Sequence, residues 1–370
     1  MTNLFDAVAL KGLKLKNRVA MAPMTRARCP NNIPTAETAR YYAQRAGAGL
    51  IVTEGTVISA QGSGFVGCPG LWSGEQIAAW QPVTEAAHDL GAAIFTQIWH
   101  VGRISHTSLK PGGKAPVSAT GQQAVKSSAF GITADGTPGF VPASQPHALA
   151  TDEIAPVVED FAQAAANAVA AGFDGVEIHG ANGYLVEQFL NGAVNDRTDR
   201  YGSQSIDNRI RFALEVVDAC IARIGADRVG IRLSPFGRLH ELGDFAGEEE
   251  TFLTLAAELG KRSVAYVHIM DQASRGAPAM PEGFLAKFRK AFDGILILAG
   301  GMTAQKANTM LAEGLIDIAA FGVPFIANPD LVERMRHDWP LQAPDPASYY
   351  GGDARGYIDW PCFLTGDEKA

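Results

Sequence analysis

The sequence has few cysteines, and their spacing excludes several kinds of site. Only four of the 370 residues are cysteine, at Cys29, Cys68, Cys220 and Cys362, and no two of them form a CxxC pair. This spacing argues against a disulfide framework and against a zinc or iron–sulfur site built from cysteine. We therefore expect reduced thiols, no bound metal and a cytoplasmic protein.

Long apolar runs and an excess of positive charge are absent as well. No stretch reaches the roughly 18 uninterrupted apolar residues of a membrane span, and residues 1–10 lack the basic start and apolar run of a signal peptide. The formal net charge of −8 argues against nucleic acid or an anionic membrane as the main partner. Hydrophobic residues make up 47% of the chain, which is ample for a large core.

Short apolar runs alternate with longer amphipathic segments through most of the chain. Eight runs are predicted to be strands: Asn17–Met24, Leu50–Ser59, Ala92–Trp99, Asp174–His179, Arg228–Leu233, Ala265–Met270, Ile295–Ala299 and Ile316–Phe321. Helical patterns between them include Ile154–Ala171, Arg209–Ile224, Glu249–Arg262, Glu282–Ala291 and Thr303–Glu313. Strands separated by helices pair in parallel, and eight such units close into a (β/α)8 barrel. A doubly wound open sheet is the competing architecture.

The polar and glycine residues able to do chemistry favour the barrel. They follow the carboxyl ends of many predicted strands, where a barrel builds its active site, whereas an open sheet concentrates them at one switch point. They are Thr25, Gly55, Gln97–His100, His179, Arg232, Gly300, Gly301 and Gly322. We therefore predict an α/β chain that forms one TIM barrel domain over residues 1–370.

Two segments do not fit the alternation of strands and helices. Residues 1–16 contain short apolar pieces around Lys11 and Gly12, which we interpret as a hairpin at the barrel floor. Residues 101–150 are rich in Gly, Pro and Ser, show no helical period and are too long for an ordinary loop. We expect this second segment to be an insertion that forms a lid or cap after the third strand.

One glycine motif is interpreted as a loop. Gly62–Gly67 matches GxGxxG and follows a strand, but a dinucleotide site also needs a helix that opens on those glycines. Here Cys68–Gly70 intervenes before the next helical pattern begins near Ser73. We expect a flexible loop at the barrel mouth instead of a Rossmann site.

The strongest local signal is the run His179–Tyr184, HGANGY, at the end of the fourth predicted strand. His179 and Asn182 are two neutral hydrogen-bond donors three residues apart, so they can converge on one oxygen. Tyr184 is a phenol two residues further on and can deliver a proton nearby. A polar turn with a structural histidine is the alternative.

With these residues in place, the chain resembles the old yellow enzyme family of FMN-dependent reductases. The matching motifs run in order along nearly the whole sequence: Ala22–Arg26, Thr53–Gly55, Gln97–His100, His179–Tyr184, Asn195–Gly202, Gly230–Pro235, Ile326–Asp330 and Gly356–Asp359. The resemblance implies non-covalent FMN at the carboxyl-terminal mouth of the barrel, with NAD(P)H as the hydride donor.

The resemblance also implies which residues hold the isoalloxazine ring. The segment Pro23, Met24 and Thr25 would line the ring, and Gly55 would leave room for it. Gln97 would pair with the pyrimidine edge. Arg232 would lie by N1 and O2, where its positive charge stabilises the anionic reduced flavin.

The phosphate of FMN would lie at the last two strand ends, a common phosphate location in such barrels. The residues implied are Gly300, Gly301, Met302, Gly322 and Val323. Family members usually have Gly-Arg where this chain has Gly322 and Val323, so one guanidinium contact to the phosphate is missing. We expect weakened FMN retention, and Arg275 is a candidate substitute.

The implied reaction is the reduction of an electron-poor alkene, such as an enone, enal, maleimide or nitroalkene. NAD(P)H reduces the flavin, and hydride then passes from flavin N5 to the β-carbon of an alkene whose oxygen binds His179 and Asn182. Tyr184 protonates the α-carbon from the other face.

Aromatic walls and three alternatives complete the expectations. Trp99, Phe65 and Tyr357 resemble the aromatic walls of the substrate pocket in the family, with ordinary packing as the alternative.

A flavin-free aldolase barrel would need a lysine at an inner strand end, and none of the eight predicted strands ends in one. A barrel that has lost its flavin and only binds ligands stays open because of Val323. The sequence is compatible with a monomer or a homodimer.

Overall fold

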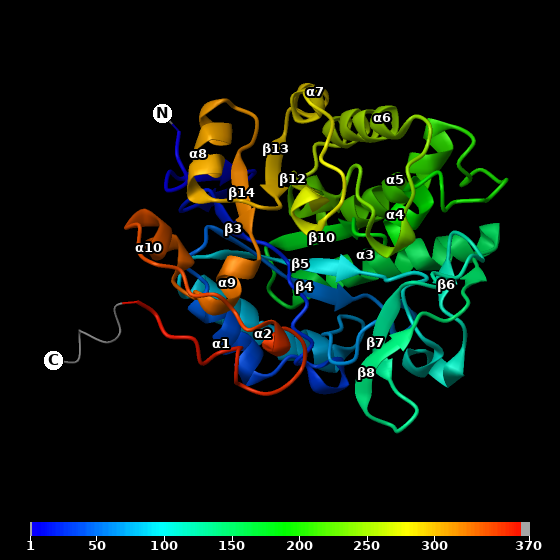
Figure 1. The fold of residues 1–370 in the computed structure, drawn as a ribbon, viewed down its shortest axis with the longest axis horizontal. Helices are drawn as coiled ribbons and strands as arrows, with labels where there is room; N and C mark the ends of the chain where they lie inside the picture. The colour runs from blue at the N-terminus through cyan, green and yellow to red at the C-terminus, as the bar shows by residue number, and fades with distance from the viewer. Residues whose placement is uncertain (1, 364–370) are drawn as a thin grey trace.

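The computed structural model describes residues 2–363 and contains a closed barrel of eight parallel strands. In barrel order the strands are β3 (Val19–Met21), β4 (Leu50–Val57), β5 (Ala93–Trp99), β10 (Gly175–Gly180), β11 (Val229–Leu233), β12 (Tyr266–Met270), β13 (Ile295–Ala299) and β14 (Ile318–Phe321). Pairing of β14 with β3 closes the ring. Figure 1 shows these strands at the centre of the molecule with helices around them. The predicted (β/α)8 barrel is confirmed.

Helices connect the successive strands of the barrel. The connecting helices are α1 (Ala36–Gln44), α2 (Gly74–His88), α3 (Ile154–Ala170), α5 (Ile206–Ile224), α6 (Glu248–Lys261), α7 (Phe284–Ala291) and α8 (Ala304–Ala312). Three shorter helices are α4 (Leu185–Leu190), α9 (Val323–Ala327) and α10 (Leu331–Arg336). All five predicted helical segments are confirmed, with small differences at their ends.

The first barrel strand is shorter than predicted. It ends at Met21, and the chain continues without regular structure through Thr25. The backbone N–H groups of Arg26 and Ala27 each donate to the Glu54 carboxylate at 2.9 Å, so they do not extend the ladder. This contact holds an irregular segment at the carboxyl end of β3.

The N-terminal hairpin closes the floor of the barrel, as predicted. Strands β1 (Val8–Leu10) and β2 (Leu13–Leu15) pair antiparallel. Leu10 and Leu15 are buried and pack with inward-facing residues that include Leu50 and Tyr266. Because these two begin β4 and β12, the hairpin lies at the amino ends of the strands, away from the site.

Residues 101–150 form an excursion after β5 that contains two small sheets. Their strands are β6 (Val117–Ser118), β7 (Ser128–Ile132), β8 (Pro138–Pro142) and β9 (His147–Ala148). The β7–β8 hairpin extends from the body at the lower right of Figure 1. A bridge between Phe65 and Phe130 joins this hairpin to the loop after β4. The predicted excursion is confirmed, and its β structure is an addition to the prediction.

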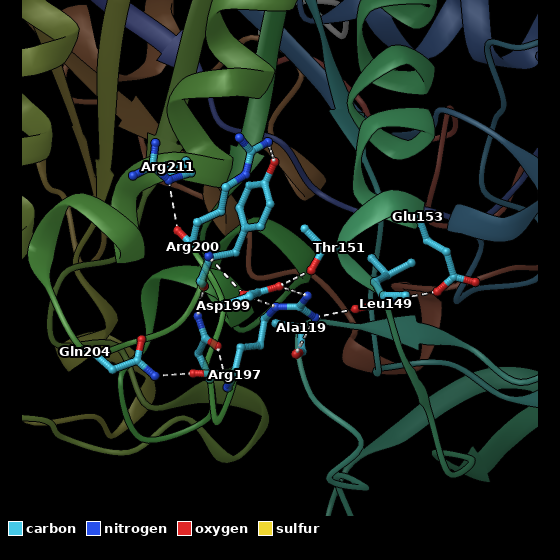
Figure 2. A network of polar contacts seen from close by, with 12 residues as sticks. Ala119, Leu149, Thr151, Glu153, Arg197, Asp199, Arg200, Gln204 and Arg211 are labelled. Carbon is cyan, nitrogen blue, oxygen red and sulfur yellow. Dashed lines mark hydrogen bonds and ion pairs between the residues drawn. The ribbon is translucent and has the colours of Figure 1, made fainter.

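The motif Asn195–Gly202 fastens this excursion to the loop between α4 and α5. The Arg197 guanidinium donates to the carbonyls of Ala119 and Leu149 and to the carboxylate of Asp199 (Figure 2). Asp199 also accepts a hydrogen bond of 2.6 Å from the Thr151 hydroxyl. In this chain the motif thus has a structural role.

Residues 2–363 include no helix that combines the length and apolar character needed to cross a membrane, nor a His/Cys/Asp/Glu cluster suited to a metal ion.

Cys29, Cys68 and Cys220 are buried free thiols. Burial raises the pKa of each of them, so they are protonated and unreactive at neutral pH.

Candidate active site

The carboxyl ends of the barrel strands bring the predicted site residues together. Strand register places Gly55 beside Gln97 and His179 beside Arg232. The Trp99 indole at the end of β5 stacks on the His179 ring, with centroids 6.1 Å apart and planes 21° apart. Four neighbouring strands, β4, β5, β10 and β11, therefore contribute to one site.

His179 lies one residue before the end of β10 and is a buried, neutral donor. Burial and the charge of Arg232 lower its pKa well below the ordinary value. Its Nδ1 accepts a hydrogen bond of 3.3 Å from the backbone N–H of Ala181, which places the ring proton on Nε2. The imidazole can therefore donate a hydrogen bond to another group through Nε2–H.

Asn182 lies in a tight turn directly after β10. Its φ is 57° and that of Gly183 is 77°, a left-handed conformation that asparagine and glycine tolerate best. The Asn182 N–H donates to Ser234 Oγ at 2.8 Å, and the Gly183 N–H donates to the carboxyl group of Glu187 at 2.6 Å. The Ser234 hydroxyl donates to the other oxygen of this carboxyl group at 2.7 Å. Two buried side chains thus hold the backbone of this turn.

Tyr184 follows the turn and immediately precedes α4. Its ring packs edge-on against Trp99 and His179, with centroid distances of 4.9 Å in both cases. Burial raises the pKa of its phenol above the ordinary value, so the hydroxyl is protonated at neutral pH. The rings of His179 and Tyr184 are thus in contact, and Asn182 lies in the turn between them; we call these three neutral side chains the donor group.

A buried carboxylate, Glu177 on β10, binds one predicted cofactor residue, Gln97, and acts on the charge of another, Arg232. Its Oε1 accepts from Gln97 Nε2 at 2.8 Å, and its Oε2 lies 2.8 Å from His268 Nδ1. Burial lowers the pKa of Arg232 to about 10 while Glu177 opposes this shift, so the guanidinium is charged at neutral pH. Arg232 Nε is buried and has no partner within residues 2–363. Buried N–H groups generally have an acceptor, and a bound group at the mouth would supply one here.

The irregular segment Pro23–Thr25 is half-buried between the ends of β3 and β14. The Met24 sulfur lies 3.6 Å from the position that a Cβ on Gly322 would occupy. Gly55 has a packing role besides the predicted one, because a Cβ there would come within 2.4 Å of the Trp99 indole. Glycine at this position lets Trp99 lie across β4.

The predicted phosphate end follows β13 and β14. Gly300 and Gly301 have φ values of 113° and 57°, and a Cβ on Gly300 would come within 2.1 Å of the Asp271 carbonyl oxygen. Met302 is buried in the main core, and Gly322 precedes the first residue of α9. That first residue, Val323, is 51% exposed and provides no charge for a phosphate.

The structure places Tyr357 away from the aromatic wall predicted for it. The Tyr357 ring is fully buried, stacks on Tyr41 at 4.2 Å and lies under the Arg28 guanidinium at 4.7 Å. Its environment is therefore the core between α1 and the C-terminal segment. The neighbouring aromatic residue Tyr350 lies beside Phe65, with ring centroids 6.2 Å apart. Phe65 in turn lies 5.7 Å from Trp99, as the wall requires.

Two further residues of the site were not predicted. The His240 ring, in the loop after β11, lies 5.2 Å from the Tyr184 ring. Burial and the charge of Arg275 lower the pKa of His240 to about 4, so it is neutral. Gln272 contacts Asn182, as described below. Neither His240 nor Gln272 belongs to one of the motifs named above, so no local pattern indicates them.

Together these features suit a bound flavin. Gln97 and Arg232 present polar groups to the mouth at fixed positions, and glycines and small residues line the ends of β13 and β14. Gln97, Arg232 and the Pro23–Thr25 segment would hold the ring system, and the segment after β13 would hold the phosphate.

Comparison with known proteins decides the family. The chain matches the NADH:flavin oxidoreductase / NADH oxidase family over residues 3–342. It superimposes on morphinone reductase with a TM-score of 0.96 and 46% identity, over 99% of this chain and 98% of that one. It superimposes on the old yellow enzyme homologue from Zymomonas mobilis with a TM-score of 0.91 and 38% identity, over 97% of this chain and 99% of that one. The chain belongs to the old yellow enzyme family.

Relatives from rice agree with this assignment. The 12-oxophytodienoate reductase 1 of Oryza sativa subsp. japonica is 43% identical over 364 residues, which cover 97% of this chain and 92% of the relative. As a member of the old yellow enzyme family, the chain is an NAD(P)H-dependent flavin oxidoreductase whose cofactor is FMN.

Proposed function

We propose that this old yellow enzyme family member is an ene-reductase that reduces C=C bonds conjugated to a carbonyl or nitro group. Two of its relatives are named as reductases of 12-oxophytodienoate and of morphinone. The observation that supports the proposal most directly is the donor group, in which neutral His179, Asn182 and Tyr184 lie together at one strand end.

His179 and Asn182 bind the carbonyl or nitro oxygen of the substrate. His179 donates through Nε2–H, because Nδ1 is occupied by the Ala181 N–H. As negative charge develops on the oxygen during reduction, both hydrogen bonds strengthen. Each donor of this kind contributes about 2.7–4 kcal/mol to the barrier reduction.

Tyr184 supplies the proton that completes the reduction. When FMN is bound and reduced by NAD(P)H, it would supply the hydride that the β-carbon receives. The Tyr184 hydroxyl, protonated at neutral pH, then transfers its proton to the α-carbon. Packing against Trp99 and His179 holds the Tyr184 ring in place, and this packing therefore sets the position of the Tyr184 hydroxyl group.

Gln97 and Arg232 adapt the barrel to the cofactor. When FMN is bound, the amide oxygen of Gln97 would accept from its ring system, because one N–H of Nε2 is already bound to Glu177. The positive charge of Arg232 favours the negative charge that the cofactor gains on reduction.

Ligand binding tests the proposed oxygen clamp. The FMN-loaded protein and the variant with both His179→Ala and Asn182→Ala are titrated with 4-chlorophenol by calorimetry. We expect at least about tenfold weaker binding in the variant, since two charge-assisted hydrogen bonds are lost. Equal affinity, at equal flavin content, would remove these residues as the clamp.

A further inference from the structure

Gln272 is a buried glutamine that joins two loops at the mouth of the barrel. It begins the short 3₁₀ helix η8 (Gln272–Arg275) after β12 and is only 2% exposed. Its amide reaches Asn182 on one side and the backbone of Arg238 and Leu239 on the other. Gly237 permits this close approach, because a Cβ there would come within 2.7 Å of Gln272 Nε2.

The contacts of Gln272 determine which end of its amide faces Asn182. The backbone N–H groups of Arg238 and Leu239 lie 2.9 and 3.2 Å from Oε1. Backbone N–H groups can only donate, so the oxygen of Gln272 must face them. Nε2 therefore faces Asn182 and can only donate to it.

This orientation in turn determines the orientation of Asn182. Gln272 Nε2 donates to Asn182 Oδ1 at 3.1 Å. The Asn182 amide must present its oxygen to Gln272, which leaves Nδ2 as the end available to donate to another group. The same reasoning applies to His179, where the Ala181 N–H occupies Nδ1 and leaves Nε2–H as the donor.

The backbone of Asn182 is held by other groups. Its N–H donates to Ser234 Oγ at 2.8 Å, and Glu187 binds both Ser234 and the Gly183 N–H. The position of the turn therefore depends on Ser234 and Glu187, whereas the direction of the side-chain amide depends on Gln272.

We infer that Gln272 is a positioning residue that fixes the Asn182 side chain as a hydrogen-bond donor toward the substrate oxygen. The inference rests on the proposed oxygen clamp of the ene-reductase. Without this contact, the amide can turn and present Oδ1, an acceptor, to an oxygen that gains negative charge. Gln272 acts through Asn182 and needs no contact with the substrate.

The variant Gln272→Glu tests this role with a minimal change of shape. A carboxylate still accepts from the Arg238 and Leu239 N–H groups, but it cannot donate to Asn182. Asn182 then donates its own Nδ2–H to the new carboxylate and turns its oxygen toward the ligand. We expect binding of 4-chlorophenol to the FMN-loaded protein to weaken about 10–100-fold.

The Asn182→Ala background separates orientation from charge. An effect of Gln272→Glu that passes through Asn182 disappears when Asn182 is absent, whereas direct repulsion by the new carboxylate persists. We therefore expect less than about a threefold change between Asn182→Ala and the double variant. An equal loss in both backgrounds would overturn the positioning role.

A neutral substitution and two controls complete the experiment. Gln272→Leu adds no charge and removes the orienting donor, so we expect a smaller loss of 4-chlorophenol binding, of about 2–10-fold. Unchanged binding in both Gln272 variants would overturn the inference. Gln305→Glu, an exposed change on α8, is the matched control, and FMN affinity should be unchanged in every variant. If Asn182→Ala alone leaves binding unchanged, the clamp itself fails, which is a separate result.

Discussion

Glu177 accepts a hydrogen bond of 2.8 Å from Gln97 Nε2, and this contact determines which end of the Gln97 amide faces the barrel mouth. Because the nitrogen is bound to a carboxylate, the amide oxygen is left to accept from a bound ring. The same carboxylate contacts His268 and acts on the charge of Arg232. One buried acid therefore organises the side of the site where we propose that FMN binds, which we call the cofactor side.

Replacing Glu177 with Gln should weaken FMN binding and destabilise the fold. The substitution leaves the buried charge of Arg232 without its nearby anion and allows Gln97 to turn. Breaking a buried charge pair on one side costs about 3–5 kcal/mol. Titration with FMN and urea unfolding at pH 7 measure the two effects.

The control for this prediction is Glu313→Gln, which replaces an exposed glutamate that follows α8. It should change neither FMN affinity nor the free energy of unfolding. If Glu177→Gln also leaves both unchanged, the buried acid does not organise the cofactor side.

Replacing Tyr184 with Phe should separate the two half-reactions. The ring contacts with Trp99 and His179 persist in phenylalanine, but the proton donor is lost. We expect flavin reduction by NADPH to be unchanged and alkene reduction to slow by about 10²–10⁴-fold. Stopped-flow absorbance measures each step separately, and a similar loss in both would refute the role of proton donor.

The stability of the protein should depend on pH through Glu187. Burial raises the pKa of this carboxyl to about 8, against the hydrogen bonds from Gly183 and Ser234. In the unfolded chain its pKa is about 4.3. Between these values the folded state retains a proton that the unfolded state has lost. The free energy of unfolding therefore falls as pH rises, by at most about 1.4 kcal/mol per pH unit from this group.

The variant Glu187→Gln isolates this effect. Its amide is uncharged like the protonated carboxyl and does not titrate, and its oxygen can still accept from the Gly183 N–H. Buried histidines such as His179 and His268 also make the free energy of unfolding depend on pH. Because both proteins contain them, their contribution cancels when the two slopes are compared. Urea unfolding between pH 5 and 8 should show a more negative slope for the unchanged protein. Parallel slopes would mean that Glu187 is ionised throughout this range.

Replacing Val323 with Arg should improve retention of FMN. Val323 is exposed beside Gly322 at the predicted phosphate end, so a guanidinium there can reach a phosphate from solvent. A charge-assisted hydrogen bond should tighten FMN binding about 10–100-fold. Flavin absorbance after dialysis measures retention. Val125→Arg, at another exposed valine, should have no effect, and equal retention in all three proteins would mean that another group already satisfies the phosphate.

Much of the fold was predictable because the barrel depends on a pattern repeated along the chain. The alternation of buried strands with amphipathic helices identifies eight units, and closure follows from that number. The irregular segment after β3 was less predictable, because the hydrogen bonds from Arg26 and Ala27 to Glu54 that anchor the chain beyond it join distant parts of the sequence.

The positions of His179 and Arg232 on neighbouring barrel strands were predictable, because each is a polar residue at the end of an apolar run. The site was not predictable where position depends on tertiary packing. Tyr350 and Tyr357 are both aromatic residues of the C-terminal segment, and only the fold distinguishes the wall residue from the buried one. Gln272 contacts Asn182 across 90 residues of sequence, so no local pattern indicates it.

An anaerobic absorbance titration tests the central proposal most directly. NADPH is added to the FMN-loaded protein, and 2-cyclohexenone follows once the flavin absorbance has bleached. The ene-reductase proposal predicts bleaching by NADPH, recovery of the flavin band on addition of the enone, and cyclohexanone as the product. A flavin that bleaches but stays reduced in the presence of the enone would contradict the proposal. A protein that binds no FMN would favour a barrel that only binds ligands.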